Sequence, residues 1–281
     1  MFAREDILPT NDVAFKQIFW NEEYPEVLIS FINSILKRND PITSIKLGNT
    51  EVISESNGKH SIRLDVVGTT SNNEILNIEM QKNNNDNMIK RSLYYWAKLY
   101  ASQLPEGEKY KTLNPVITIN ILDFNLFKDK VCNRSFILKN TKTNEEYLKM
   151  LEIHFVELKK RQYLDDNDEL FAWAEFLKSP SSKSLISKNP VIDVVLTAKE
   201  IFNKTIADPI QLERIRLNEK EEMDNRAFLA CAHDDGVAEG LAKGEHKKAI
   251  ETAKNLLKMG LSIEQVSQGT GLSIEEIKLL F

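Results

Sequence analysis

The chain has few of the residues on which disulfide-rich, zinc-binding and membrane proteins depend. Its 281 residues include only two cysteines, Cys132 and Cys231, which lie far apart, so we expect neither a disulfide framework nor a cysteine-based zinc cluster. No apolar run approaches the roughly 18 residues that a membrane span needs. The first residues lack the apolar core of a signal peptide. We therefore expect a cytoplasmic protein that does not contact a membrane.

Several catalytic signatures are also missing. The sequence contains no glycine-rich phosphate-binding loop and no Gly-x-Ser-x-Gly motif, so neither kind of active site is expected. Its four histidines are scattered, and none has a partner at metal-ligand spacing. The net charge of −5 argues against a protein that coats nucleic acid. Residues 82–111 hold six bases against three acids, a local bias that fits either a DNA-facing region or an ordinary solvated surface.

Hydrophobic periodicity predicts an irregular alternation of helices and strands in the first part of the chain. Helices are expected over residues 11–20, 25–37 and 88–104, and strands over 42–52, 62–69, 75–81, 115–126, 131–140 and 151–158. Beyond about residue 165 the pattern is helical only. Strands that alternate with helices favour an α/β fold with a mixed sheet flanked by helices. We expect this core over residues 1–165 and an all-helical extension over residues 166–281.

Two of the expected strands form a hairpin that carries two acids. If the hairpin turns about Asn72, residues whose numbers sum to 144 face each other, so Asp65 lies opposite Glu79 and Arg63 opposite Gln81. Directly opposed side chains have Cβ atoms roughly 4.5–5.5 Å apart. Two carboxylates at that separation repel unless a proton or a cation lies between them. Mg²⁺, which prefers oxygen ligands, suits such a pair.

An alternative remains open for the same residues. Polar side chains on a solvated sheet face are common, and a two-residue turn would place the two acids on opposite faces. Like charges that directly oppose each other destabilise a sheet, however, whereas solvated faces usually pair opposite signs. Geometry alone therefore leaves the metal site and the solvated face as two competing interpretations.

The end of the chain contains a short duplication. Residues 261–266 (LSIEQV) recur as residues 272–277 (LSIEEI), and Ser262 with Gln265, like Ser273 with Glu276, fits a capping box. With residues 249–259, this predicts three short helices, which could form a helix-turn-helix DNA reader. The last helix carries two acids and a single base, so packing or oligomerisation is the favoured interpretation.

Four sequence pieces, in this order, resemble the PD-(D/E)XK nuclease superfamily, and most closely its recombination-promoting nuclease and transposase branch. They are residues 12–19 (DVAFKQIF), 63–66 (RLDV), 78–81 (IEMQ) and 91–95 (RSLYY). The resemblance covers most of the chain and includes the helical tail. It implies a restriction-endonuclease-like core, DNA as partner, and hydrolysis of DNA phosphodiester bonds in recombination or transposition.

The resemblance also implies roles for individual residues. Asp65 and Glu79 would bind Mg²⁺ or another divalent cation, with the backbone carbonyl of Met80 as a third ligand. The metal would activate a water and polarise the phosphate. Gln81 stands where the superfamily has lysine, so it can orient water but brings no positive charge. Asp12 is a further candidate metal ligand, and a helix-start residue is its competing interpretation.

Basic and aromatic residues near these acids are candidates for DNA contact. They are Lys16, Arg63, Arg91 and Tyr94. A solvated surface position is the competing interpretation for Lys16, and a structural salt bridge is the competing interpretation for Arg63. We therefore expect a Mg²⁺-dependent DNA endonuclease of low sequence selectivity. The helical extension could also join copies of the chain into a homo-oligomer. The two alternatives are a degenerate fold that binds DNA without cutting it and a protein-interaction or oligomerisation module.

Overall fold

A computed structural model describes most of the chain. The described residues are 4–52, 62–84, 87–104, 107, 109–146, 149–186 and 189–280; within them, the side chains of residues 5, 51, 52, 62, 63 and 186 are not described. The chain divides into two compact units, Met1–Asn218 and Glu219–Phe281.

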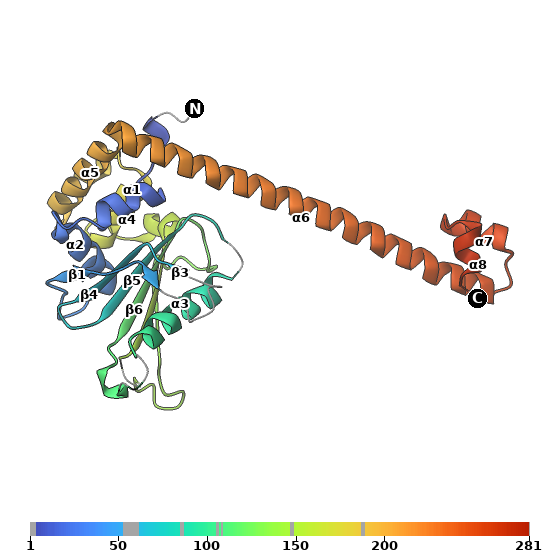
Figure 1. Ribbon diagram of the computed structural model, residues 1–281, viewed down its shortest axis with the longest axis horizontal. Helices are drawn as coiled ribbons and strands as arrows, with labels where there is room; N and C mark the ends of the chain where they lie inside the picture. Colours follow the sequence, from blue (N-terminus) through green and yellow to red (C-terminus); the bar gives the residue numbers. More distant parts are fainter. Residues whose placement is uncertain are drawn as a thin grey trace. The chain divides into compact units, whose positions relative to one another are not determined.

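A mixed sheet forms the centre of the larger unit (Figure 1). Within the described residues, six strands follow the order β1-β4-β5-β6-β8-β7. Their bounds are Ile45–Leu47 (β1), Val66–Thr70 (β4), Ile75–Gln81 (β5), Val116–Leu122 (β6), Leu151–Glu157 (β8) and Asn133–Ile137 (β7). The strands β5, β6 and β8 are parallel, and the outer pairs are antiparallel. A separate antiparallel pair joins β2 (Glu51–Val52) to β3 (Ile62–Arg63).

The predicted hairpin register is confirmed. The strands β4 and β5 pair Val66 with Ile78 and Thr69 with Ile75, so the paired numbers sum to 144. The first strand is not continuous, however, because the chain bends at Asp65 between β3 and β4. Arg63 pairs with Glu51 in the small sheet, so the expected pairing of Arg63 with Gln81 is wrong.

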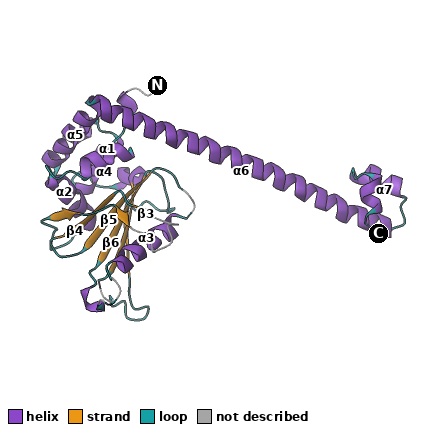
Figure 2. Cartoon of the chain, viewed as in Figure 1, coloured by secondary structure: helices purple, strands orange, loops and turns teal. Residues whose placement is uncertain are grey.

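Helices cover both faces of the sheet (Figure 2). One face packs against the helices α1 (Asp12–Phe19), α2 (Pro25–Leu36), α4 (Glu169–Lys178) and α5 (Ile192–Ala207) around the main apolar core. The other face packs against α3 (Met88–Ser102) through two smaller clusters. Short 3₁₀ helices span Arg4–Asp6, Tyr110–Thr112, Leu158–Tyr163 and Lys183–Ile186. The predicted α/β class, a mixed sheet flanked by helices, is confirmed.

The larger unit extends beyond the expected boundary near residue 165. The helices α4 and α5 belong to the main core, where Trp173 is fully buried and packs against Phe19 and Phe31 at centroid distances of 5.8 and 5.4 Å. Because aromatic side chains of this size dominate core energetics, these helices are part of the same folded unit. A functional division into residues 1–165 and 166–281 stays a prediction.

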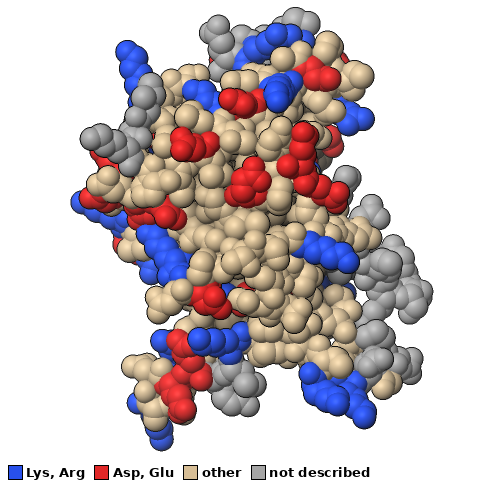
Figure 3. Space-filling view, turned by 90° about the vertical axis from the view of Figure 1, so that its left-hand side faces the viewer, with Lys and Arg blue, Asp and Glu red and all other residues tan. Residues whose placement is uncertain are grey.

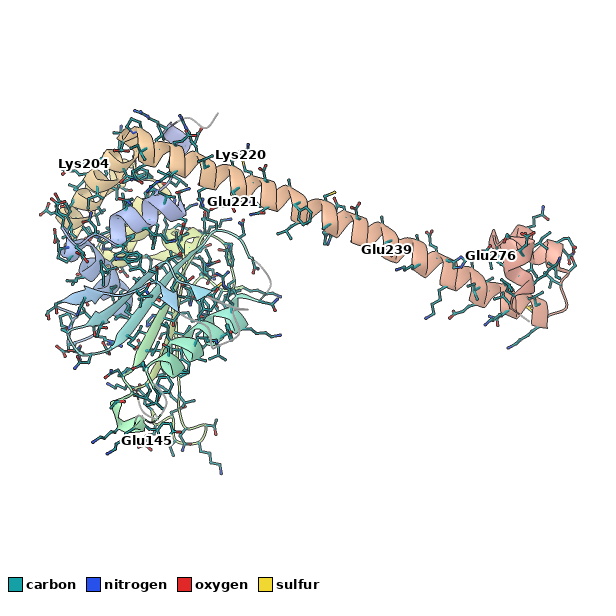
Figure 4. The ribbon with its side chains drawn as sticks, viewed as in Figure 1. Glu145, Lys204, Lys220, Glu221, Glu239 and Glu276 are labelled. Atoms are coloured by element: carbon teal, nitrogen blue, oxygen red, sulfur yellow. The ribbon has the colours of Figure 1, made fainter. Side chains whose placement is uncertain are left out.

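The helix α6 (Pro209–Lys258) begins in the larger unit and ends in the smaller one. It is continuous through Gly236, Gly240 and Gly244, although glycine has a low helix propensity. Most of its middle is exposed, and Figure 4 shows the side chains of Glu221 and Glu239 pointing away from the helix. Oligomerisation through the helical extension stays a prediction.

The smaller unit ends in α7 (Ile263–Thr270) and α8 (Ile274–Lys278). Both predicted capping boxes are present, at Ser262 and at Ser273. Gly260 and Gly271 make the turns with φ of 88° and 74°, which favour glycine. Apolar residues from all three helices form one small core: Ala253, Val266, Leu272 and Ile277. DNA reading by this tail stays a prediction.

Across the described part of the chain, no helix combines the length and the apolar character that a membrane crossing requires.

Candidate metal centre

The candidate site lies where the bend before β4 meets the end of β5 and the first turns of α1. Asn11 caps α1 by accepting hydrogen bonds from the backbone of Val13 and Ala14 at 3.0 and 3.3 Å. The buried face of α1 packs into the core through residues such as Phe15. This packing directs Asp12 and Lys16, which are one turn apart, toward the bend at Asp65.

Lys16 connects two of the predicted acids. Its Nζ lies 2.7 Å from Asp12 Oδ1 and 3.1 Å from Asp65 Oδ1. Burial alone would lower the pKa of Lys16, but Asp12 and Asp65 together raise it above its ordinary value. Lys16 is therefore a stable cation beside Asp65.

Asp65 is held against β5 by the backbone. Its Oδ2 accepts a hydrogen bond of 2.9 Å from the Met80 N–H. In an extended strand the N–H and C=O of one residue point to the same edge, so the Met80 carbonyl is directed to the edge where Asp65 lies. Burial raises the pKa of Asp65, against the opposing effects of Lys16 and the Met80 N–H.

Glu79 is the most unusual residue of the site. It is only 2% exposed, and its Oε1 has no hydrogen-bond partner among the described residues. Burial and, second, the charge of Asp65 raise the pKa of Glu79 to about 8, although Arg91 opposes the shift. The charge of Asp65 therefore acts on Glu79, which is buried in the sheet.

Arg91, on α3, contacts both Glu79 and Gln81, the third predicted catalytic residue. Its Nη1 donates a 3.0 Å hydrogen bond to Gln81 Oε1, and its Nη2 lies 4.0 Å from Glu79 Oε2. Its Nε donates to the Tyr95 hydroxyl at 3.0 Å, and the guanidinium lies 5.0 Å from the centre of the Tyr95 ring. A positive charge therefore stands beside Gln81, which itself has none.

The remaining candidates are placed as follows. Tyr94 is exposed on the outer side of α3, where Lys98 Nζ lies 5.9 Å from its ring centre. The side chain of Arg63 lies outside the described residues. No group of three or more His, Cys, Asp and Glu side chains suited to a metal occurs among the described residues, so Asp12 does not join Asp65 and Glu79 in one such group.

Sequence reasoning did not single out the polar residues behind Glu79. Asn77, Thr118 and Asn120 are each fully buried on the sheet face covered by α3. They alternate with Ile117, Ile119 and other apolar residues at a period of two, and this spacing was the signal available in the sequence. The sequence predicted a buried strand within residues 115–126, and β6 is buried throughout. The prediction did not distinguish the polar face of this strand from its apolar face.

Other charged regions of the larger unit have a different character. Glu74 and Glu152, which line a surface hollow, are both ion-paired with Arg38. On the face shown in Figure 3, described lysines and arginines are interspersed with acids around an uncharged middle and do not gather into one basic patch. Glu79, whose Oε1 has no partner among the described residues, differs from these two acids.

Comparison with known proteins gives one family. The model of the PD-(D/E)XK nuclease family transposase matches residues 9–232, which include every residue of the candidate site. No curated protein and no solved structure shows a significant match to the chain. The family match spans most of the chain and includes the mixed sheet described above. The chain therefore belongs to the PD-(D/E)XK nuclease family transposases.

Proposed function

We propose that the protein is a Mg²⁺-dependent DNA endonuclease with little sequence selectivity. Asp65, Glu79 and the Met80 backbone carbonyl are the proposed metal ligands, and Gln81 is the proposed water-orienting residue. The family suggests a nuclease or a transposase-like activity, with DNA as substrate. A use in recombination or transposition, and the cytoplasmic location expected from the sequence, complete this proposal.

The observation that carries this function is the environment of Glu79. A buried carboxylate with an unpartnered oxygen is costly for a protein that needs only a stable sheet. A second acid, Asp65, increases this cost and contributes to raising the pKa of Glu79 to about 8. A divalent cation bound by both carboxylates would reverse both effects, because it favours the ionised form of each acid. The donor set of carboxylate and carbonyl oxygens suits Mg²⁺.

The residues of the chain would then divide the work. When bound, the metal supplies an activated water and polarises the scissile phosphate. Arg91 donates a hydrogen bond to Gln81 Oε1 and so fixes this side chain. The amide nitrogen of Gln81 is then left as a hydrogen-bond donor. Arg91 also provides a positive charge that glutamine lacks, in a position suited to stabilising negative charge on a phosphate. Lys16 balances Asp65 on the other side of the site.

DNA would approach across α3 and the start of α1. Tyr94 and Lys98 are neighbours on the outer side of α3, and Arg91 lies on the same helix next to the acids. Phosphate contacts by Lys and Arg supply affinity without sequence information. A contact set of this kind supports low sequence selectivity. Arg63 remains a candidate for a further phosphate contact.

A second candidate function follows from Gln81 itself. Because glutamine replaces the superfamily lysine, the protein could bind DNA without cutting it. The two functions differ in one measurable respect: both predict DNA affinity that falls with salt, but only the endonuclease predicts broken phosphodiester bonds.

The experiment is a nicking assay with purified protein, supercoiled plasmid and Mg²⁺. Wild-type protein should convert the plasmid to open-circular and linear forms, and EDTA should stop the reaction. Asp65→Asn and Glu79→Gln keep the size of each side chain, and each should lower the rate roughly 100-fold or more, because the metal contributes several kcal/mol to transition-state stabilisation. Glu152→Gln, which changes a strand acid paired with Arg38 and His154, is the matched control and should retain activity.

The outcomes separate the candidates. Cleavage that survives both substitutions indicates a contaminating nuclease or another site and contradicts the proposed function. DNA binding without cleavage at any Mg²⁺ or Mn²⁺ concentration supports the degenerate binder. No DNA affinity even at low salt supports a protein-interaction module.

A further inference from the structure

A row of buried polar side chains extends from Glu79 into the sheet beneath α3. Asn77 lies two residues before Glu79 on β5, and the parallel register pairs Asn77 with Thr118 and Glu79 with Asn120 on β6. Paired residues of neighbouring strands point to the same face, so these four side chains form one patch. We call Asn77, Thr118 and Asn120 the polar tier; each is 0% exposed.

The polar tier has more hydrogen-bonding groups than partners. Among the described residues, Asn77 Nδ2 and Oδ1, Thr118 Oγ1, Asn120 Oδ1 and Glu79 Oε1 have no partner. Such groups are rare in folded proteins, because buried polar atoms are almost always hydrogen-bonded. Five of them on two adjacent strands therefore point to a shared ligand that the side chains themselves do not provide.

The hydrogen bonds of Asn120 show that its unpartnered atom needs a hydrogen-bond donor. Its Nδ2 donates to Ser92 Oγ at 2.7 Å and to the His154 backbone carbonyl at 3.0 Å. Because a carbonyl only accepts, this assigns the nitrogen end of the amide and leaves Oδ1 as an acceptor. Ser92 belongs to α3, so the helix that carries Arg91 is also anchored to the polar tier.

The unpartnered atoms do not form hydrogen bonds with one another. The oxygens of Asn77, Asn120 and Glu79 can accept hydrogen bonds, and the Asn77 amide and the Thr118 hydroxyl can donate them, yet no two of these atoms form a hydrogen bond with each other. The Asn77 amide lies near enough to the Glu79 carboxylate to lower its pKa slightly, yet not at hydrogen-bonding geometry. A water molecule supplies two donors and two acceptors, and buried polar sites commonly hold one.

We propose that the polar tier binds ordered water that donates a hydrogen bond to Glu79 Oε1 and so fixes the orientation of this carboxylate for the metal. Asn77, Thr118 and Asn120 are then positioning residues that act through water. The inference rests on the proposed function of Glu79 as a metal ligand. Removing a residue that holds a metal ligand in place typically lowers metal affinity roughly 10- to 100-fold.

Thr118→Val is the most direct test, because valine has nearly the same shape as threonine and suits a strand. Affinity for Mn²⁺, measured by isothermal titration calorimetry, should fall roughly tenfold, while the Tm of the metal-free protein stays at or above the wild-type value. Thr118→Ser, which restores the hydroxyl, should bind Mn²⁺ nearly as tightly as wild type. Ile119→Val changes the opposite face of the same strand and should lower the Tm with little effect on affinity.

The results distinguish this inference from the function on which it rests. If wild-type protein binds Mn²⁺ and Thr118→Val binds it equally tightly, the role of the polar tier is overturned and the proposed metal site stands. If wild-type protein binds no Mn²⁺, the metal site is overturned, and the inference falls with it.

A crystal structure of the metal-free wild-type protein gives an independent measurement that needs no variant. Ordered water should contact both Glu79 Oε1 and at least one residue of the polar tier. A dry gap at this position, or a metal ion in place of water, would overturn the inference.

Discussion

The two faces of β5 and β6 are built from opposite kinds of residue. The face toward α1, α2, α4 and α5 is apolar throughout: Leu76, Ile78, Met80, Ile117, Ile119 and Ile121. The face toward α3 carries the polar tier and Glu79, which are buried to a similar degree. Both sets of side chains are buried, yet only the apolar set gains the full stability that burial can give.

The difference shows that the polar face lowers the stability of the sheet and therefore suggests that this face has a function. Full burial of an isoleucine contributes about 1.5–3 kcal/mol, whereas an unpartnered buried polar group costs about 1–3 kcal/mol. An apolar residue at each polar position would therefore give a more stable sheet. Sites that break the local rules of packing are frequently functional. The apolar face thus accounts for the fold, and the polar face is where a site is expected.

Ile119→Ala should have the largest effect and tests the apolar face. The substitution leaves a cavity in the main core, so the free energy of unfolding should fall by about 2–5 kcal/mol. Chemical denaturation measures this change. Mn²⁺ affinity of the folded variant should stay near the wild-type value, since Ile119 points away from the acids. A comparable loss of affinity would erase the distinction between the two faces.

Glu79→Gln should stabilise the metal-free protein at high pH. In the unfolded chain Glu79 loses its proton near its ordinary pKa of 4.5, whereas in the folded chain it keeps the proton until about pH 8. Between these values the folded state binds more protons, so its stability falls as pH rises through this window. Glutamine removes that loss and should add about 1–3 kcal/mol at pH 8 in EDTA.

The same pH series has a matched control in Glu152→Gln. Burial would raise the pKa of Glu152, but His154 and Arg38 lower it below its ordinary value. Its contribution is therefore present at neutral pH and lost as pH falls through the folded pKa, the opposite direction to Glu79. Glutamine at position 152 should lower the Tm at pH 8. Equal responses of the two variants would contradict the assigned environment of Glu79.

Arg91→Gln should lower cleavage with little change in fold. The arginine is the positive charge beside Gln81, and its loss should reduce the rate roughly 10- to 100-fold. Arg91→Lys should recover little, because an ammonium cannot contact Gln81 and Tyr95 together as the guanidinium does. Single-turnover kinetics would measure both rates. Full activity of Arg91→Gln would assign the charge to another residue.

Lys16→Met should have the smallest effect and tests how the charge of Lys16 changes the metal affinity of the site. The ammonium beside Asp65 repels an incoming cation, so its removal should tighten Mn²⁺ binding roughly two- to fivefold. Lys37→Met removes a lysine that pairs with Asp168 away from the site and should leave Mn²⁺ binding unchanged. Weaker Mn²⁺ binding in Lys16→Met would show that Lys16 supports the metal ligands.

Local patterns were sufficient to predict most of the fold. The bounds of α2 and β5 and the hairpin register follow from residues near one another in the sequence. The register was predicted from an assumed turn about Asn72, and a two-residue turn would instead have placed the two acids on opposite faces. The same argument did not predict the bend at Asp65, which depends on how β3 leaves the sheet to pair with β2.

The candidate site was predictable only in part, because it combines distant segments. The spacing of Asp65 and Glu79 suggested two facing acids, but it gave no measure of burial. The bond from Arg91 to Gln81 depends on how α3 crosses the sheet, and no local pattern sets that crossing. The helix α6 persists through three glycines spaced four apart, although each glycine costs about 1 kcal/mol in a helix.

Anomalous X-ray scattering from crystals grown with Mn²⁺ tests the central claim most directly. A single strong peak is predicted within ligand distance of the carboxylates of Asp65 and Glu79 and of the Met80 carbonyl oxygen, and it should disappear in Glu79→Gln. Crystals of active wild-type protein with no peak at these oxygens, or with a peak that persists in Glu79→Gln, would contradict the account.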